Sequence, residues 1–303
     1  MIALRPIRSR TRALCATQIR SYAAGPRKLR LSLGAGCIPK VDGQKGEDAF
    51  FAALPISAFG LADGVGGWAD RGVDAGLFSR ALLESALQRM RQRANAMQRP
   101  DLPGVASEAF QAVREKSLDG SCTLLLGQMQ QDMFTLLNLG DCGLMALRPC
   151  SILPRFHGGT VTTSMRLIYR STPMLHRTNL PLQLSSQDPN LSSLTEYFDL
   201  VTLKLRKGDV LIAGTDGLFD NIGDLELKSL ALSHHESRTA SGENTTQDLA
   251  DALLARAAEV ARAPMEFGPG GKLDDIAVVL AEVRESSPTT QAGLLSNLVD
   301  VDG

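Results

Sequence analysis

Aspartate lies at the end of an apolar run at four widely separated places in this chain. The four segments are GLADGVGGW (60–68, with Asp63), LLNLGDCG (136–143, with Asp141), VLIAGTDGLFD (210–220, with Asp216) and GGKLDDIAVVL (270–280, with Asp274). Apolar runs of this length are typical of buried strands, whose ends can bring distant carboxylates to one edge of a sheet. Carboxylate oxygens favour hard divalent cations such as Mg²⁺ and Mn²⁺. The pattern therefore predicts an oxygen-rich cation site.

Neighbouring residues strengthen this interpretation. Gly64 directly follows Asp63, and a glycine lets its backbone carbonyl approach a cation without a side chain in the way. Glu47 and Asp48 add two carboxylates close to another apolar run. Carboxylates brought together repel one another unless cations neutralise them. An Asp-Gly pair taken alone is more typical of a turn, but its occurrence with aspartates at several apolar ends favours a metal site.

Strand and helix patterns alternate along the chain and must position these carboxylates. Phe78, Leu82, Ala86 and Met90 are four residues apart, which predicts a long helix with one apolar face. Thr245 three residues before Asp248 is typical of a helix cap. The expected helices cover 75–96, 104–116 and a segment after residue 245, and the expected strands cover 52–61, 121–127, 133–139, 166–170, 198–206, 210–213 and 276–283. Polar stretches at 233–246 and beyond 284 are expected to be irregular.

Composition limits the classes of protein to consider. A chain of 303 residues with 44% apolar content can bury a large core, in one or two domains. The formal net charge of −1 gives no general signal for nucleic acid, and no run of 18 apolar residues predicts an integral membrane segment. The 5 cysteines are odd in number and form no CxxC pair, so neither a disulfide framework nor a zinc site is predicted.

The first forty-one residues are basic and contain no acidic residue; their cations are Arg5, Arg8, Arg10, Arg12, Arg20, Arg27, Lys28, Arg30 and Lys40. This composition is typical of a mitochondrial transit peptide. The segment Arg20-Ser21-Tyr22-Ala23 also matches a matrix-protease cleavage site after Tyr22. A second interpretation is a disordered basic tail that binds anionic surfaces. The first predicts a protein of the mitochondrial matrix.

Six motifs, in their order along the chain, resemble those of the metal-dependent, type 2C serine/threonine protein phosphatases. They are GEDAF (46–50), ADGVGGW (62–68), GSCTLLL (120–126), LGDCG (139–143), GTDGLFD (214–220) and LDDIAVV (273–279). The resemblance extends from about residue 34 to residue 283. The sequence DGVGGW and the segment 169–184 resemble the mitochondrial branch of this family.

The resemblance implies an α+β fold, in which a central antiparallel β-sandwich is flanked by helices on both faces. It divides the chain into a transit peptide and basic linker (1–33), a phosphatase domain (34–284) and a polar tail (285–303). The implied reaction is hydrolysis of phosphoserine and phosphothreonine by a water activated between two Mn²⁺ or Mg²⁺ ions. The implied partners are phosphoprotein substrates, among them matrix metabolic or ubiquinone-biosynthesis enzymes.

The same resemblance implies roles for individual residues. Asp63, Asp216 and Asp274 would be the catalytic aspartates: Asp63 would bridge the two ions, and the other two would hold the first ion. Glu47 and the Gly64 carbonyl would hold the second ion. The remaining carboxylates have accessory roles: a third metal position for Asp141, and acceptors that orient metal-bound waters for Asp48 and Asp275.

Two positions depart from the family pattern. Val65 stands where many members have a histidine that acts as general acid, and positioned acid catalysis is typically worth ~10²–10⁴-fold. Gly43 stands where members have a phosphate-binding arginine. Alternative acids are His157 and His176, and the nearest cations are Lys40, Lys45 and Arg71. None is assigned a role, so the phosphate-binding residue stays unknown.

These departures keep two other functions open. One is a catalytically weak or inactive phosphoprotein-binding regulator with the same fold. The other is a metal-dependent hydrolase of small phosphoesters. Retention of Glu47, Asp63, Asp216 and Asp274 favours the phosphatase over the inactive regulator. Trp68, the only tryptophan, has two interpretations: a wall of the substrate cleft or a core anchor.

Overall fold

The computed structural model describes residues 28–152, 161–177, 180–188, 195–241, 245–263 and 271–286. Residues 1–27 of the predicted transit peptide and linker (1–33) and residues 287–303 of the predicted tail (285–303) lie outside these ranges. In the described part of the chain, no helix has the length and apolar character needed to cross a membrane.

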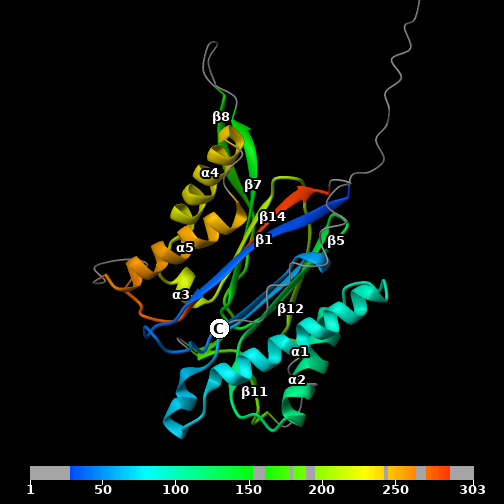
Figure 1. Ribbon diagram of the computed structural model, residues 1–303, viewed down its shortest axis with the longest axis vertical. Coiled ribbons are helices and arrows are strands. Elements are labelled where there is room, and N and C mark those ends of the chain that lie inside the picture. The colour runs from blue at the N-terminus through cyan, green and yellow to red at the C-terminus, as the bar shows by residue number, and fades with distance from the viewer. Residues whose placement is uncertain are drawn as a thin grey trace, which may run out of the picture.

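Two five-stranded antiparallel sheets form the centre of the molecule (Figure 1). One has the order β1-β14-β13-β7-β8, with bounds Leu29–Ile38, Ile276–Glu285, Val210–Gly214, Gly143–Ile152 and Thr162–Arg170. The other has the order β12-β6-β5-β3-β2, with bounds Asp199–Lys204, Met133–Leu139, Leu124–Gln130, Ala58–Ala62 and Ala49–Ala53. A buried cluster that includes Phe59, Leu136, Leu211 and Val279 joins residues of both sheets. The sheets therefore pack face to face.

Helices cover the outer face of each sheet. Helices α1 (Ala75–Asn95) and α2 (Leu102–Glu115) share a buried cluster with the second sheet, in which Phe78 and Phe110 are fully buried. Helices α3 (Asp216–Phe219), α4 (Asp224–Ser241) and α5 (Thr246–Ala261) share another with the first sheet, around Ile212 and Leu253. The predicted α+β sandwich with helices on both faces is confirmed.

Local sequence explains where these helices begin. The Asp74 carboxylate accepts a hydrogen bond from the Gly76 amide (2.9 Å) at the start of α1. Thr245 and Asp248 form the predicted capping box at the start of α5. Each cap satisfies amide groups that the helix itself leaves without partners. Short pairings complete the fold: β4 (Ser121–Cys122) with β11 (Leu184–Ser185), and β9 (Leu175–Arg177) with β10 (Leu180–Pro181).

The structure corrects several element predictions. The single strand expected at 52–61 is a hairpin of β2 and β3, because Pro55 opens a 3₁₀ turn and Ser57 has a φ of 47°. Strand β1 begins at Leu29, so the folded domain starts before the predicted boundary at residue 34. Strand β7 was not expected, and the polar stretch predicted to be irregular from 233 continues α4 to Ser241.

Strand register brings the acidic segments to one end of the sandwich. Asp63 follows the last residue of β3, Ala62, which pairs with Ala49 at the start of β2. Gly214 at the end of β13 pairs with both Gly143 at the start of β7 and Val278 near the start of β14. The segments that carry 47–48, 63, 141, 216 and 274–275 therefore meet at the same end.

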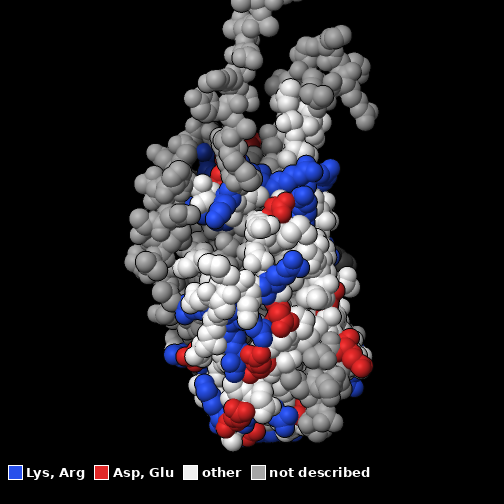
Figure 2. All heavy atoms as spheres, turned by 90° about the vertical axis from the view of Figure 1, so that its right-hand side faces the viewer, with Lys and Arg blue, Asp and Glu red and all other residues white. Residues whose placement is uncertain are grey.

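Charge on the surface is mixed. Figure 2 shows a face on which Lys and Arg side chains are interspersed with Asp and Glu side chains. This pattern agrees with the formal net charge of −1.

Candidate active site

Five aspartates come within electrostatic reach of one another. The pKa of Asp63 is raised well above its usual value, first by burial and then by the negative charges of Asp48, Asp216, Asp141 and Asp274. Burial also raises the pKa of Asp48 and of Asp274. These carboxylates therefore lie near enough to Asp63 to disfavour its charged form, and their role as metal ligands stays a prediction.

The backbone around Asp63 is fixed by strand β4. The Asp63 amide donates to the Thr123 hydroxyl (3.0 Å), and the Thr123 amide donates to the Asp63 carbonyl (2.9 Å). The Val65 amide, two residues after Asp63, donates to the Ser121 carbonyl (3.0 Å). Thr123, which sequence reasoning did not select, is thus a positioning residue for the carboxylate.

Gly64 lies where a side chain has no room. A Cβ at this position would be 2.5 Å from the Glu47 carbonyl oxygen and 2.8 Å from the Ser79 hydroxyl. Both distances are shorter than real Cβ contacts, so the backbone of 64 lies directly against that of 47. The two residues predicted to serve the second ion, Glu47 and Gly64, are therefore neighbours in space, although they belong to different segments of the sequence.

Asp141 carries a buried oxygen without a partner. Its Oδ1 is buried and accepts no hydrogen bond from any described residue. Burial, and then the charge of Asp216, raise the pKa of Asp141 to about 6. Buried polar atoms without partners are rare and costly, and they commonly mark the position of an ion or water.

Asp48 and Asp275 bind protein groups. The buried Asp48 carboxylate accepts a hydrogen bond from the Thr215 hydroxyl (2.8 Å), one residue before Asp216. The buried Asp275 carboxylate accepts from the backbone amides of Lys40 and Glu47, each at 2.6 Å. In this structure these carboxylates hold the segments that carry other acids, and a role for either in orienting metal-bound waters stays a prediction.

Two lysines contact the predicted metal ligands. The Lys272 ammonium contacts Asp216, lies 2.8 Å from the Asp220 carboxylate and lies 3.6 Å from that of Asp274. The Lys40 ammonium lies 2.6 Å from Glu47 Oε2. Lys272 was not selected from the sequence, because its contacts with 216 and 220 depend on the approach of distant segments.

These contacts outweigh the effect of burial on both lysines. Burial disfavours the charged form of Lys272, but hydrogen bonds and charges from Asp216 and Asp220 raise its pKa. Burial likewise opposes the charge of Lys40, while its hydrogen bond to Glu47 raises its pKa. Both side chains are therefore ammonium groups near neutral pH.

The donor set fits a hard divalent cation. Carboxylates and a backbone carbonyl are the ligands that Mg²⁺ and Mn²⁺ prefer, and the buried Asp141 oxygen needs a partner. Within the described chain, no Lys or Arg forms a salt bridge with Asp48, Asp63 or Asp141. No three Asp, Glu, His or Cys side chains of the described residues already converge as metal ligands; instead, Lys272 and Lys40 contact several of these carboxylates.

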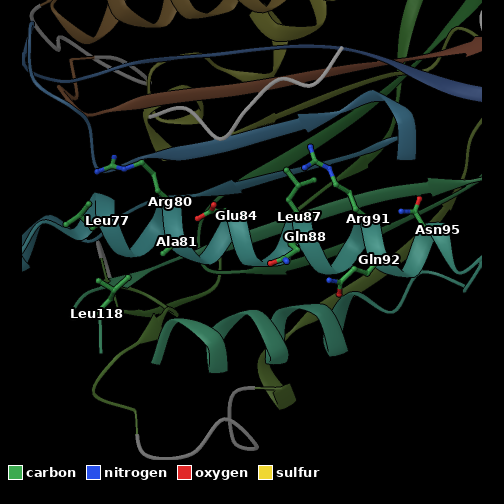
Figure 3. Close-up of a pocket in the computed structure, with 10 residues that line it drawn as sticks. All are labelled: Leu77, Arg80, Ala81, Glu84, Leu87, Gln88, Arg91, Gln92, Asn95 and Leu118. Atoms are coloured by element: carbon green, nitrogen blue, oxygen red, sulfur yellow. The ribbon is translucent and has the colours of Figure 1, made fainter. Parts of the chain in front are cut away.

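Two hollows lie close to this end of the molecule. A cavity of about 230 Å³ borders Glu47 and is lined also by Lys40, Lys45 and Asp275. A wider groove of about 850 Å³ follows α1 (Figure 3). Arg80, at one end of that groove, donates to the Gly46 carbonyl (3.0 Å) beside Glu47. The groove thus begins next to the acidic site but lies mainly on the helix.

The remaining sequence candidates lie as follows. Trp68 is half-buried: its indole nitrogen donates to the Ser121 hydroxyl (2.7 Å), and the Arg71 guanidinium lies 5.3 Å from its ring centre. Trp68 is therefore hydrogen-bonded to Ser121, which also binds the turn after Asp63. His176 is exposed in β9 and His157 lies outside the described residues. Neither is placed as the missing acid.

Known proteins similar to this chain are protein phosphatases. The protein phosphatase PTC7 homolog fig of Drosophila grimshawi is 32% identical over 294 residues, which cover 89% of this chain and 90% of the relative. Probable protein phosphatase 2C 26 of Arabidopsis thaliana is 32% identical over 278 residues and 86% of either chain. Probable protein phosphatase 2C 71 of Oryza sativa subsp. japonica is 30% identical, but this chain spans only 53% of its length.

Solved structures show the same fold. The photosystem II phosphatase PBCP matches with a TM-score of 0.65 and 26% identity, over 84% of this chain and 99% of that one. The catalytic domain of the serine threonine protein phosphatase PstP, in complex with 2 manganese ions, matches with a TM-score of 0.56 and 17% identity, over 85% of this chain and 100% of that one. Residues 167–284 also match the family model of Stage II sporulation protein E (SpoIIE). The chain belongs to the protein phosphatase 2C family of serine/threonine phosphatases.

Proposed function

We propose that this protein is a Mn²⁺- or Mg²⁺-dependent phosphatase that hydrolyses phosphoserine and phosphothreonine in other proteins. The observation that carries the proposal is the cluster of half-buried and buried aspartates around Asp63, whose pKa is raised first by burial and then by the negative charges of its neighbours. Membership of the protein phosphatase 2C family supports the same activity, and PstP, which has this fold, holds two manganese ions.

In this proposal, each ion has its own ligands. Asp63 would bridge both ions, Asp216 and Asp274 would hold the first, and Glu47 with the Gly64 carbonyl would hold the second. Asp141, with its buried oxygen free of hydrogen bonds, would serve a third position. When bound, such ions supply a water activated for attack on phosphorus and neutralise the phosphoryl oxygens.

The chain's own contribution is to hold these ligands in place. Asp275 fixes the Glu47 segment through its amide, and Thr123 fixes the Asp63 segment. Thr215 links the Asp48 carboxylate to the backbone of β14, because its hydroxyl also accepts from the Ala277 amide (3.0 Å). The ligands are thus fixed by hydrogen bonds to the sheets, which favours a preorganised site.

Val65 leaves the site without the usual histidine, so the leaving oxygen would take its proton from solvent. This is compatible with turnover, since positioned acid catalysis contributes only ~10²–10⁴-fold of the rate. The cations nearest Glu47 are Lys40 and Lys45, which line its cavity. Neither is assigned to phosphate.

The test of the activity is hydrolysis of a phosphoserine or phosphothreonine peptide by the purified chain. Activity is expected with added Mn²⁺ or Mg²⁺ and is expected to disappear with a chelator. Asp63→Asn and Asp216→Asn should be almost inert. Hydrolysis of small phosphoesters but not of phosphopeptides would favour the small-molecule hydrolase, and metal binding without any turnover would favour an inactive regulator.

We also propose that the protein acts in the mitochondrial matrix, on phosphorylated metabolic enzymes such as those of ubiquinone biosynthesis. The acid-free basic segment 1–41 and the similarity to a relative named PTC7 homolog support the location. A fusion of residues 1–41 to a fluorescent protein should enter mitochondria. The same fusion with its arginines changed to serine should not enter mitochondria. If neither fusion is imported, the proposed location is contradicted.

A further inference from the structure

Lys272 makes the densest set of ionic contacts at the candidate site. Its ammonium contacts Asp216 and lies 2.8 Å from Asp220 and 3.6 Å from Asp274. Two of these three carboxylates are the ones assigned above to the first ion. A lysine has three donors and a single positive charge, so one ammonium can partly neutralise all three groups.

The position of this lysine is built into the fold. Asn221 is almost completely buried, and its side-chain amide donates to the carbonyls of both Lys272 (2.9 Å) and Gly217 (2.8 Å). The Lys272 amide in turn donates to the Asn221 side-chain oxygen (3.2 Å). The lysine backbone is therefore tied on both sides to the segment that follows β13, whereas a solvated surface lysine needs no such anchor.

A divalent cation and the Lys272 ammonium would compete for the same oxygens. We propose that Lys272 is a resident counter-cation of the first metal position, which neutralises Asp216 and Asp274 and must release them when a divalent ion binds. This inference rests on the two-ion site of the proposed function. It makes Lys272 a residue that sets metal affinity, and not a metal ligand or a phosphate-binding residue.

Asp220 can remain the ion-pair partner of Lys272 after the ammonium leaves the proposed metal ligands. Its side chain is 49% exposed and is not among the proposed ligands, and at 2.8 Å it is already a partner of Lys272. The ammonium can therefore remain paired with Asp220 when it leaves the other two carboxylates. Exchange then needs only a small movement of a flexible side chain, with no change in the sheets.

The experiment measures Mn²⁺ binding by calorimetry and thermal unfolding in chelator for the full chain and for Lys272→Met. Removing the ammonium should tighten Mn²⁺ binding by roughly 10-fold, because a hydrogen bond between charged groups no longer has to be broken. The same variant should unfold about 2–4 °C lower in chelator, because three carboxylates lose their counter-charge. If Lys272→Met does not fold, Lys272→Gln provides the same comparison.

Two controls separate direct competition from general electrostatics. Lys204→Met removes an exposed lysine that pairs with Asp132 (3.3 Å) in the second sheet, and it should change neither measurement. At 1 M salt, where the Debye length is about 3 Å, the gain for Lys272→Met should persist. A gain that vanishes in high salt would mean only long-range repulsion and would overturn the proposal.

The remaining outcomes are distinct. If wild-type protein binds Mn²⁺ and hydrolyses phosphopeptides, but Lys272→Met binds Mn²⁺ equally or more weakly, the counter-cation proposal fails and the proposed function stands. If neither protein binds Mn²⁺, both fail. If only Lys272→Met binds, the counter-cation proposal is supported and the wild-type chain is held in a metal-free state by its own lysine.

Discussion

The carboxylates at the two ends of strand β13 differ in how they are neutralised. Asp209, just before the strand, is completely buried and accepts from Arg148 Nε (2.7 Å), from Arg148 Nη2 (2.5 Å) and from the Arg206 amide (2.7 Å). At the other end, Asp216 is one of the aspartates whose negative charges, after burial, raise the pKa of Asp63, and Lys272 is its ion-pair partner. Strand β13 thus lies between Asp209, which has an arginine partner, and Asp216, which lies among other aspartates.

A second buried acid with arginine partners lies at the Asp209 end of β13 (the satisfied end). Glu282 pairs with Val210 in the sheet register, is almost fully buried, and forms salt bridges with Arg238 and Arg284. Both acids at this end therefore have arginine partners, which can bind carboxylates through several donors. The contrast indicates that this chain can neutralise a buried acid fully. Among the described residues no arginine forms an ion pair with Asp63 or Asp216, which supports the proposal that this end binds a ligand.

The largest expected effect comes from Asp63→Asn. Loss of the carboxylate proposed to bridge the two ions should lower kcat/KM by about 10³-fold or more, since a bound metal supplies several kcal/mol of transition-state stabilisation. In chelator the same variant should be as stable as the wild type or more stable, because the charged form of Asp63 is disfavoured in the folded chain. Phosphopeptide kinetics and urea unfolding measure the two effects.

A variant that is both inactive and strongly destabilised in chelator would break the comparison. It would show that Asp63 supports the fold in the way that Asp209 does. Asp209→Asn is the matched control, because it makes the same chemical change at an aspartate that precedes β13, away from the acidic site.

Asp209→Asn should have the second largest effect, and on stability. Removing one partner of a buried ion pair typically costs about 3–5 kcal/mol, because the remaining charge, here Arg148, stays buried without its partner. Urea unfolding should show this loss, while activity per folded molecule should stay near that of the wild type. Unchanged stability would mean that the Arg148 pair adds nothing, and the two ends would then not differ.

Gly64→Ala should affect the acidic end alone. The added methyl would lie 2.5 Å from the Glu47 carbonyl oxygen, so the two segments must separate. Displacements of about 1 Å near a reacting centre can cost ~10²-fold in rate, and a partial adjustment should cost about 10-fold. Gly67→Ala is the control, since a Cβ at 67 meets no atom within 4 Å. Equal activity of both variants would contradict the close approach.

The positions of the acidic residues could be predicted from the sequence better than the other strands and contacts of the fold. Asp63 and Asp216 each follow an apolar run, which is a local signal that needs no tertiary information. Strand β7 lacked such a signal, because it carries Arg148 and Pro149. The proline is tolerated because this stretch extends past the first residue of β13 and pairs only with β8. The Lys272 contacts were also hidden, because they join segments more than fifty residues apart in sequence.

The smallest expected effect is a pH dependence at the satisfied end, through His234 on α4. Burial lowers the pKa of His234, with Arg238 and Arg284 acting in the same direction and Glu282 and Asp248 opposing them. The unfolded chain therefore takes up a proton more readily, so stability is complete above the unfolded pKa of about 6.5 and is lost as pH falls below it. The loss should stay under about 1 kcal/mol.

His234→Gln isolates this effect, because the glutamine carries no proton to gain. Unfolding in urea between pH 7.5 and 5 should show a smaller loss of stability for His234→Gln than for the wild type. His235→Gln, a change at the half-buried neighbour on the same helix, should leave the wild-type slope unaltered. A steep loss that both variants share with the wild type would contradict the assignment of this pH dependence to His234.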